Sequence, residues 1–231
     1  MGNIRWQPIS DSLRRIYQEQ NILHHFEKDE AYLKNAFEIT ETLWEKQFNE
    51  MNKLKIIMIS ESPLFGDIQR YIYNPNTPTS AFFHFKDLEA FLEKGQSIKR
   101  PKTIQEQKKI MFEYFRKNGF ITLDIFPFAL NPKHTKIHYR KMSKRLYQQL
   151  LQISDENYLI PKLKLCLAKS DKHTHYVYRY KRLFNKTEDH FENVLKSIGS
   201  EEIQYRIDTI NGTNMSLDRN KLRELLKTRH A

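Results

Sequence analysis

Two carboxylates, Glu61 and Asp124, stand at the ends of two short apolar segments. Glu61 follows the run at 55–60 and precedes Pro63, and Asp124 lies near the end of the run at 120–125. Continuous apolar runs bounded by turn residues are typical of parallel strands buried on both faces. Open α/β sheets place their ligand sites beyond the carboxyl ends of such strands. Two carboxylates beside aromatic residues could do acid–base work on a flat polar substrate, although capping a helix or pairing with a lysine is the commoner role.

The connection 64–85, which follows Glu61, is long and rich in aromatic residues, among them Tyr73, Phe82 and Phe83. Connections longer than most are usually either functional or disordered. A high aromatic content argues against disorder. The sequence therefore predicts an ordered, functional loop directly after the first carboxylate.

The spacing of apolar residues predicts an alternation of strands and helices. Four segments are predicted to be strands: 55–60, 120–125, 163–168 and 203–209. Helical spacing covers 10–50, 103–119, 140–152, 187–198 and a last helix from 217. Strands separated by helices indicate a parallel α/β sheet with right-handed connections. We expect a three-layer α/β/α fold around a four-stranded parallel sheet, in one domain over 1–231 on which residues 1–50 pack as a helical extension.

The chain carries a large excess of basic residues. Thirty-nine Lys and Arg residues against 28 Asp and Glu residues give a net charge of +11 over 231 residues. This balance predicts attraction to polyanions, and to nucleic acid before membrane, because no amphipathic basic helix or long apolar run dominates. A basic surface without any partner would produce the same balance.

Cysteine and histidine usage argues against a metal centre. The chain has a single cysteine, Cys166, which excludes a disulfide framework, a Cys-rich zinc site and a cysteine-ligated iron–sulfur cluster. His173 with His175, and His134 with His138, invite a zinc interpretation, but no carboxylate or cysteine completes either set. We therefore expect no metal site.

The sequence also contains no segment that suggests a membrane or an export route. The N-terminus lacks the apolar core of a signal peptide, and no stretch approaches the roughly 18 apolar residues of a membrane span. The protein is expected to be soluble and cytoplasmic, and to act as a monomer.

Segment 169–186 combines basic residues with tyrosines. Lys172, Arg179, Lys181 and Arg182 could neutralise phosphates while tyrosine rings stack on bases, a composition that suits a nucleic-acid surface. An ordinary amphipathic segment whose tyrosines pack inward has the same pattern. The sequence leaves both interpretations open.

The first part of this arrangement resembles the uracil-DNA glycosylase superfamily. That superfamily has an acidic motif of the form Gly-Gln-Asp-Pro or Gly-Glu-Ala-Pro after a strand, and Ser60-Glu61-Ser62-Pro63 occupies that place. The superfamily's aromatic residue that stacks on the extruded base comes later in the loop, where this chain has Phe82 and Phe83. Its next strand ends in an Asn that reads the base edge, at the position of Asp124.

The resemblance extends over most of residues 53–227. The superfamily's last strand runs into a His-Pro-Ser-Pro-like loop that bears an apolar wedge, which is matched here by Asn211-Gly-Thr-Asn214 followed by Met215. The resemblance implies that Glu61 is the catalytic base and that Asn211 donates a hydrogen bond to a base carbonyl. It implies a base pocket formed by Ser62, Tyr73, Phe82, Phe83 and Asp124. DNA contacts are then expected from Asn214, Met215, Ser216, Lys172, Arg179, Lys181 and Arg182.

The departures from the superfamily pattern concern the chemistry. Ser62 stands where the best-known branch has its catalytic Asp, and a serine cannot activate water comparably. Glu61 matches the Glu of the Gly-Glu-Ala-Pro branch, but that branch carries an iron–sulfur cluster, which one cysteine cannot hold. Asn211 replaces the loop histidine and cannot become cationic. No cofactor is expected.

These features predict a DNA glycosylase that flips out a modified or damaged base and hydrolyses its N-glycosidic bond. An ionised Asp124 offers only hydrogen-bond acceptors, which favours a cytosine-type or other amino-bearing base over uracil. Two alternatives remain. The chain could be a nucleic-acid-binding protein of the same fold without catalysis, or an α/β hydrolase or transferase of free nucleotides.

Overall fold

The computed structural model describes residues 4–78, 82–139, 142–199, 206–212 and 216–227. Its centre is a sheet of four parallel strands in the order β2-β1-β3-β4. The strands are β1 (Ile56–Ser60), β2 (Phe120–Asp124), β3 (His175–Tyr178) and β4 (Arg206–Thr209). The predicted parallel α/β sheet is thus confirmed.

The predicted strand at 163–168 is wrong, because this segment belongs to α5 (Ile160–Leu167). A short apolar run does not distinguish a buried strand from a buried helix. Here Leu163 and Cys166 point into the core at helical spacing. The third strand is His175–Tyr178, whose four residues are all buried although polar residues surround it in the sequence.

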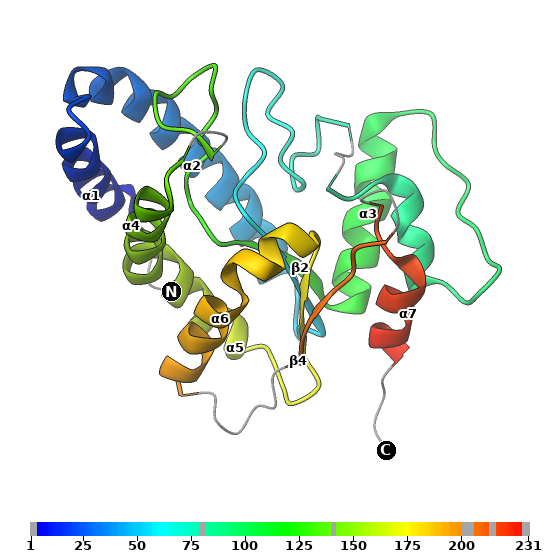
Figure 1. Cartoon of the computed structure of the whole chain (residues 1–231). Coiled ribbons are helices and arrows are strands. Elements are labelled where there is room, and N and C mark those ends of the chain that lie inside the picture. The colour runs from blue at the N-terminus through cyan, green and yellow to red at the C-terminus, as the bar shows by residue number, and fades with distance from the viewer. Residues whose placement is uncertain (1–3, 79–81, 140–141, 200–205, 213–215, 228–231) are drawn as a thin grey trace.

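Helices cover both faces of the sheet, as Figure 1 shows. One layer contains α3 (Ile104–Asn118), α7 (Arg219–Lys227) and the 3-10 helix η2 (Phe85–Phe91). The opposite layer contains α4 (Lys144–Ser154), α5 and α6 (Lys181–Ser197). This arrangement is the expected three-layer α/β/α architecture.

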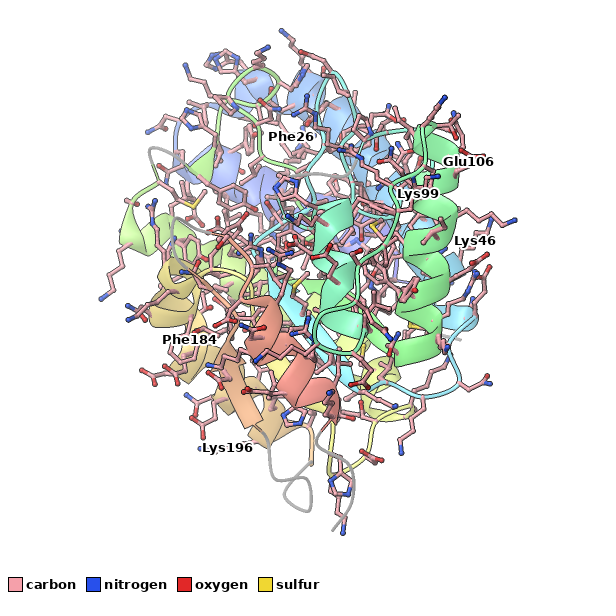
Figure 2. The ribbon with its side chains drawn as sticks, turned by 90° about the vertical axis from the view of Figure 1, so that its right-hand side faces the viewer. Phe26, Lys46, Lys99, Glu106, Phe184 and Lys196 are labelled. Carbon is pink, nitrogen blue, oxygen red and sulfur yellow. The ribbon has the colours of Figure 1, made fainter. Side chains whose placement is uncertain are left out.

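Figure 2 looks onto the layer of α3 and α7. Lys99 and Glu106, which are both exposed, lie in the upper right of this view. Beneath the layer, Phe83, Phe115 and Phe120 pack ring against ring, with centroids 4.7–5.5 Å apart. Polar residues therefore face outward on this layer while its aromatic residues build the core against the sheet.

The helical segment expected at 10–50 consists of α1 (Trp6–Glu19), a short 3-10 turn (Leu23–His25) and α2 (Phe26–Asn49). The core side chains of both helices are buried in one continuous apolar cluster with those of the sheet. α1 packs on α2 and α4. The end of α2 reaches the free edge of β2, where the indole Nε1 of Trp44 donates a 2.8 Å hydrogen bond to the carbonyl of Thr122.

Local sequence signals define both ends of α3, the helix that precedes β2. Thr103 caps its N-terminus by accepting a hydrogen bond from the amide of Glu106 and donating one to the Glu106 carboxylate. Gly119 ends the helix at φ +59°, and a Cβ at this position would lie 2.5 Å from the carbonyl of Lys53. Only glycine fits this close approach. β2 starts at the next residue and runs alongside β1.

Candidate active site at the carboxyl ends of β1 and β2

A pocket opens where β1 and β2 end. Ser60 and Asp124 are the last residues of the two strands and lie directly opposite each other in the parallel register. The loops that follow both strands rise from this same end of the sheet (Figure 1). The pocket is small and partly open to solvent, and it is lined by Ser60, Ser62, Leu64, Tyr71, Ile72, Phe82, Thr122 and Asp124.

Asp124 is the acidic group of this pocket. Its side chain is buried, and the Ser60 hydroxyl donates a 2.5 Å hydrogen bond to Oδ1. Burial raises the pKa of Asp124 to about 6, against the opposing effects of the Ser60 hydrogen bond, the positive charge of Lys162 and a hydrogen bond from Tyr71. The carboxyl group can thus change its protonation state just below neutral pH.

A buried ion pair lies behind Asp124. Lys162 Nζ is 2.5 Å from Glu41 Oε1 and 3.1 Å from the Tyr158 hydroxyl, and it sits 3.9 Å above the Trp44 ring. Burial raises the pKa of Glu41, while Lys162 opposes that rise. Trp44, whose ring lies under Lys162, also donates a hydrogen bond to the carbonyl of Thr122 in β2. The ion pair therefore contacts the strand that carries Asp124 through this tryptophan.

An irregular helical turn positions Tyr158 and Lys162 beside Asp124. A π-helical turn, η4 (Asp155–Leu159), joins α4 to α5 and carries Tyr158, and such turns occur frequently at functional sites. The Ser154 hydroxyl, just before the turn, donates a hydrogen bond to the carbonyl of Ile125, the residue after Asp124. Sequence reasoning missed Lys162 and Glu41, because nothing in their local pattern distinguishes them from exposed helix residues.

Glu61 lies beside the pocket rather than among the residues that line it. Its Oε1 accepts a 3.2 Å hydrogen bond from the Tyr147 hydroxyl and is 3.7 Å from Lys186 Nζ. Lys186 Nζ also lies 3.1 Å from the centre of the Tyr147 ring, and burial lowers the pKa of this lysine while Glu61 raises it. The next residue, Ser62, lines the pocket. Glu61 is therefore adjacent to the pocket but already engaged by two partners.

Of the three aromatic residues predicted to form the base pocket, only one lines the observed pocket. Phe82 lines the pocket. Phe83 is fully buried in the aromatic core under α3, and the Tyr73 hydroxyl is held by the amide and hydroxyl of Thr122. Neither residue lines the pocket, and their assignment to the base site is corrected. Tyr71, which the sequence did not single out, lines it instead.

Two buried contacts hold the Tyr71 segment in place. Tyr73 accepts the amide hydrogen of Thr122 at 2.7 Å, so it also satisfies the unpaired edge of β2. Lys108, from α3, donates a 2.6 Å hydrogen bond to the carbonyl of Ile72, and burial lowers the pKa of this lysine to about 8. The wall of the pocket is therefore fixed from both the sheet and the helix layer.

Arg179 is buried, which corrects its assignment to a DNA-contacting surface. It follows β3 directly and is 1% exposed. Its Nε donates a 2.8 Å hydrogen bond to the carbonyl of Phe82, and a terminal nitrogen donates one of 3.1 Å to the carbonyl of Ser216. Tyr176 and Tyr178 are also buried, so the inward-packing interpretation holds for these tyrosines.

The other three basic residues predicted for DNA contact, Lys172, Lys181 and Arg182, are exposed. Lys172 precedes β3 at the amino end of the strand, whereas Lys181 and Arg182 follow it at the carboxyl end, where the pocket lies. Of the four predicted basic residues, Lys181 and Arg182 are therefore both exposed and located at the pocket end of the sheet, Lys172 is exposed at the other end, and Arg179 is buried.

The loop after β4 closes on itself. Asn211 and Leu217 form an antiparallel bridge, and the Gly212 amide donates a 2.8 Å hydrogen bond to the carbonyl of Ser216. The Asn211 amide group donates to the carbonyl of Gly212 at 3.1 Å, and Asn211 is not among the residues that line the pocket. Ser216 is exposed, whereas the predicted contacts Asn214 and Met215 lie outside the described residues.

Comparison of the chain with protein-family models, with curated proteins and with solved structures found no match. In the described part of the chain, no group of three or more His, Cys, Asp or Glu side chains is placed to hold a metal ion. None of the helices in that part is long and apolar enough to cross a membrane. The chemistry of the pocket is therefore the basis for a functional proposal.

Proposed function

We propose that the protein is a DNA glycosylase that takes an extruded base into the pocket at the ends of β1 and β2 and hydrolyses its N-glycosidic bond. One observation carries the proposal: a buried carboxyl group, Asp124, shares a narrow pocket with the aromatic rings of Phe82 and Tyr71. Rings bind the faces of a flat heterocycle, and a buried polar group reads its edge. The net charge of +11 favours a polyanionic substrate.

Asp124 favours a base that presents an amine. Above its pKa of about 6 the carboxylate only accepts hydrogen bonds. It would accept one from an exocyclic amine of the cytosine type, but it would repel the O4 carbonyl of uracil. A mismatch at a buried polar site leaves groups unpaired and is strongly rejected. We therefore propose a modified cytosine-type base as the substrate.

Glu61 would supply the catalytic carboxylate. In this role it orients water toward C1′, or it stabilises the cationic sugar as the N-glycosidic bond breaks, by the logic of glycoside hydrolysis. Its present partners are Tyr147 and Lys186. A DNA phosphate would attract Lys186, whose side chain is 42% exposed, and so release the carboxylate. The proposed reaction needs no cofactor.

A second function has one observation in its favour. Glu61 is paired with Lys186 and does not line the pocket, as expected of a nucleic-acid-binding protein that recognises an extruded base without removing it. Such a protein would bind the same DNA but produce no abasic sites.

The deciding experiment incubates the protein with duplexes that each contain one modified base, followed by detection of the free base by mass spectrometry. The glycosylase proposal expects release from at least one amino-bearing base and little release of uracil. Asp124→Asn should shift this preference toward uracil. DNA binding without release of any base would support the binding protein instead, and the absence of both would reject both proposals.

A further inference from the structure

Two large apolar side chains are exposed beside the pocket. Leu64 is 48% exposed and Ile68 is 53% exposed, and they are the large hydrophobic residues found exposed in the described part of the chain. Both belong to the segment that follows Glu61, and Leu64 itself lines the pocket. Single exposed apolar residues are common, but these two share one short segment at the mouth of the candidate active site.

The segment that carries them is firmly anchored. Phe65, between the two, is buried against Ala36 of α2 and Ala129 of the loop after β2. Its carbonyl accepts hydrogen bonds from the Tyr32 hydroxyl at 3.1 Å and from the Asn131 amide at 3.3 Å.

Gly66 adds a close backbone contact to this anchor. A Cβ at this position would lie 2.9 Å from the side-chain amide nitrogen of Asn131, so the backbone packs closely against that side chain. The fold therefore holds the apolar side chains outward on a fixed support, instead of leaving them on a loose loop.

The charge around the segment suits a nucleic acid. Its acidic residue, Asp67, is paired with Lys133 at 3.3 Å, which offsets the negative charge. Arg70 and Lys136 are exposed nearby in the same two loops and add positive charge beyond this pair. An apolar tip with a basic surround matches a base stack bordered by phosphates.

We infer that Leu64 and Ile68 form an apolar wedge that enters the DNA base stack next to the extruded nucleotide. The inference rests on the proposed function, since it assumes that the base in the pocket comes from DNA. Removing a nucleotide from a duplex leaves a gap, and apolar side chains inserted between base steps offset the lost stacking. Because Leu64 also lines the pocket, one segment would contact both the extruded base and the gap.

Binding to DNA that already contains a gap tests the wedge without requiring catalysis. The probes are a duplex with one tetrahydrofuran abasic-site analogue and the same duplex fully matched, and the affinities are measured by fluorescence anisotropy. The Leu64→Ala/Ile68→Ala variant should lose roughly tenfold in affinity for the abasic duplex, the scale of burying one large aliphatic side chain. Its affinity for the matched duplex, which depends on phosphate contacts, should change less than twofold.

A matched control keeps the apolar volume. Leu64→Met/Ile68→Leu should preserve the preference for the abasic duplex, and thermal melting should show that both variants fold. An unchanged preference in the alanine variant would overturn the wedge, whatever the wild type does to modified bases. Loss of self-association in the alanine variant, without an effect on the abasic duplex, would identify the segment as a protein interface and also overturn it. If the wedge effect is present while no base is released, only the proposed catalysis fails.

Discussion

The guanidinium Nε of Arg179 donates a hydrogen bond of 2.8 Å to the carbonyl oxygen of Phe82. The same group reaches the carbonyl of Ser216, so one buried side chain at the end of β3 connects the pocket wall to the loop after β4. The two segments belong to distant parts of the sequence. Arg179 therefore positions the candidate site instead of binding the substrate.

Replacing Arg179 with Lys should destabilise the protein and weaken its base pocket. Lysine keeps the charge but lacks the planar fork that serves two acceptors at once. A buried carbonyl left without a donor costs about 1–3 kcal/mol, which urea unfolding would detect. Arg182→Lys, at an exposed neighbouring position, is the control and should stay within about 0.5 kcal/mol of the wild type. Equal stability of the two variants would contradict the positioning role.

The pKa of Asp124 should respond in opposite directions to the two members of the buried ion pair. Lys162→Met removes a positive charge that lowers this pKa and should raise it, while Glu41→Gln removes a negative charge that raises it and should lower it. The measurement is the titration of the Asp124 carboxyl carbon by NMR, assigned with Asp124→Asn.

Removing one partner of a buried pair leaves an uncompensated charge and is strongly destabilising. The double variant Lys162→Met/Glu41→Gln removes both charges and is the control for folding. Its Asp124 pKa should lie between those of the single variants. Shifts of the same sign in both single variants would show a general disturbance of packing instead of an electrostatic effect.

The stability of the protein should depend on the protonation of Asp124. Its pKa is raised from 3.8 to about 6 in the folded state, so between pH 4 and pH 6 the folded state binds more protons than the unfolded state. The stabilisation from this group is complete below pH 4 and is lost as the pH rises through 6. Compared with Asp124→Asn, the free energy of unfolding of the wild type should fall by on the order of 3 kcal/mol between pH 4 and pH 6. Parallel pH profiles of the two proteins in urea unfolding would refute the raised pKa.

Glu61→Gln should remove most base release while the protein still folds and binds DNA. A positioned acid–base group typically contributes about 10²–10⁴-fold to the rate, and a single-turnover assay on the released base measures this loss directly. Glu192→Gln, on the exposed surface of α6, is the matched control and should leave the rate unchanged. An undiminished rate in Glu61→Gln would exclude this carboxylate from the reaction.

Charge reversal at Lys181 and Arg182, the exposed basic residues after β3, should weaken DNA binding and reduce its salt dependence. Each phosphate contact that is lost changes the logarithmic salt slope by about 0.9 for duplex DNA. Lys46→Glu is the control, because Lys46 lies in the last turn of α2, which leads to the opposite end of the sheet. The same loss of affinity in the control would indicate attraction to net charge rather than a defined surface.

The sequence alone determined the features that depend on neighbouring residues. Two continuous apolar runs specified β1 and β2, and the capping pair Thr103 and Glu106 with Gly119 specified the helix between them. Because parallel strands share one carboxyl edge, these local signals also placed Glu61 and Asp124 at the same end of the sheet.

Only the tertiary structure decided which side chains are buried and which partners they meet. The run at 163–168 is a helix because α5 packs its Leu163 face into the core, and the polar-flanked segment at 175–178 became a strand because β1 and β4 pair with it on both sides. The pairing of Lys162 with Glu41 joins residues 121 positions apart. Burial and charge pairing arise from contacts distant in sequence, so no local pattern could reveal them.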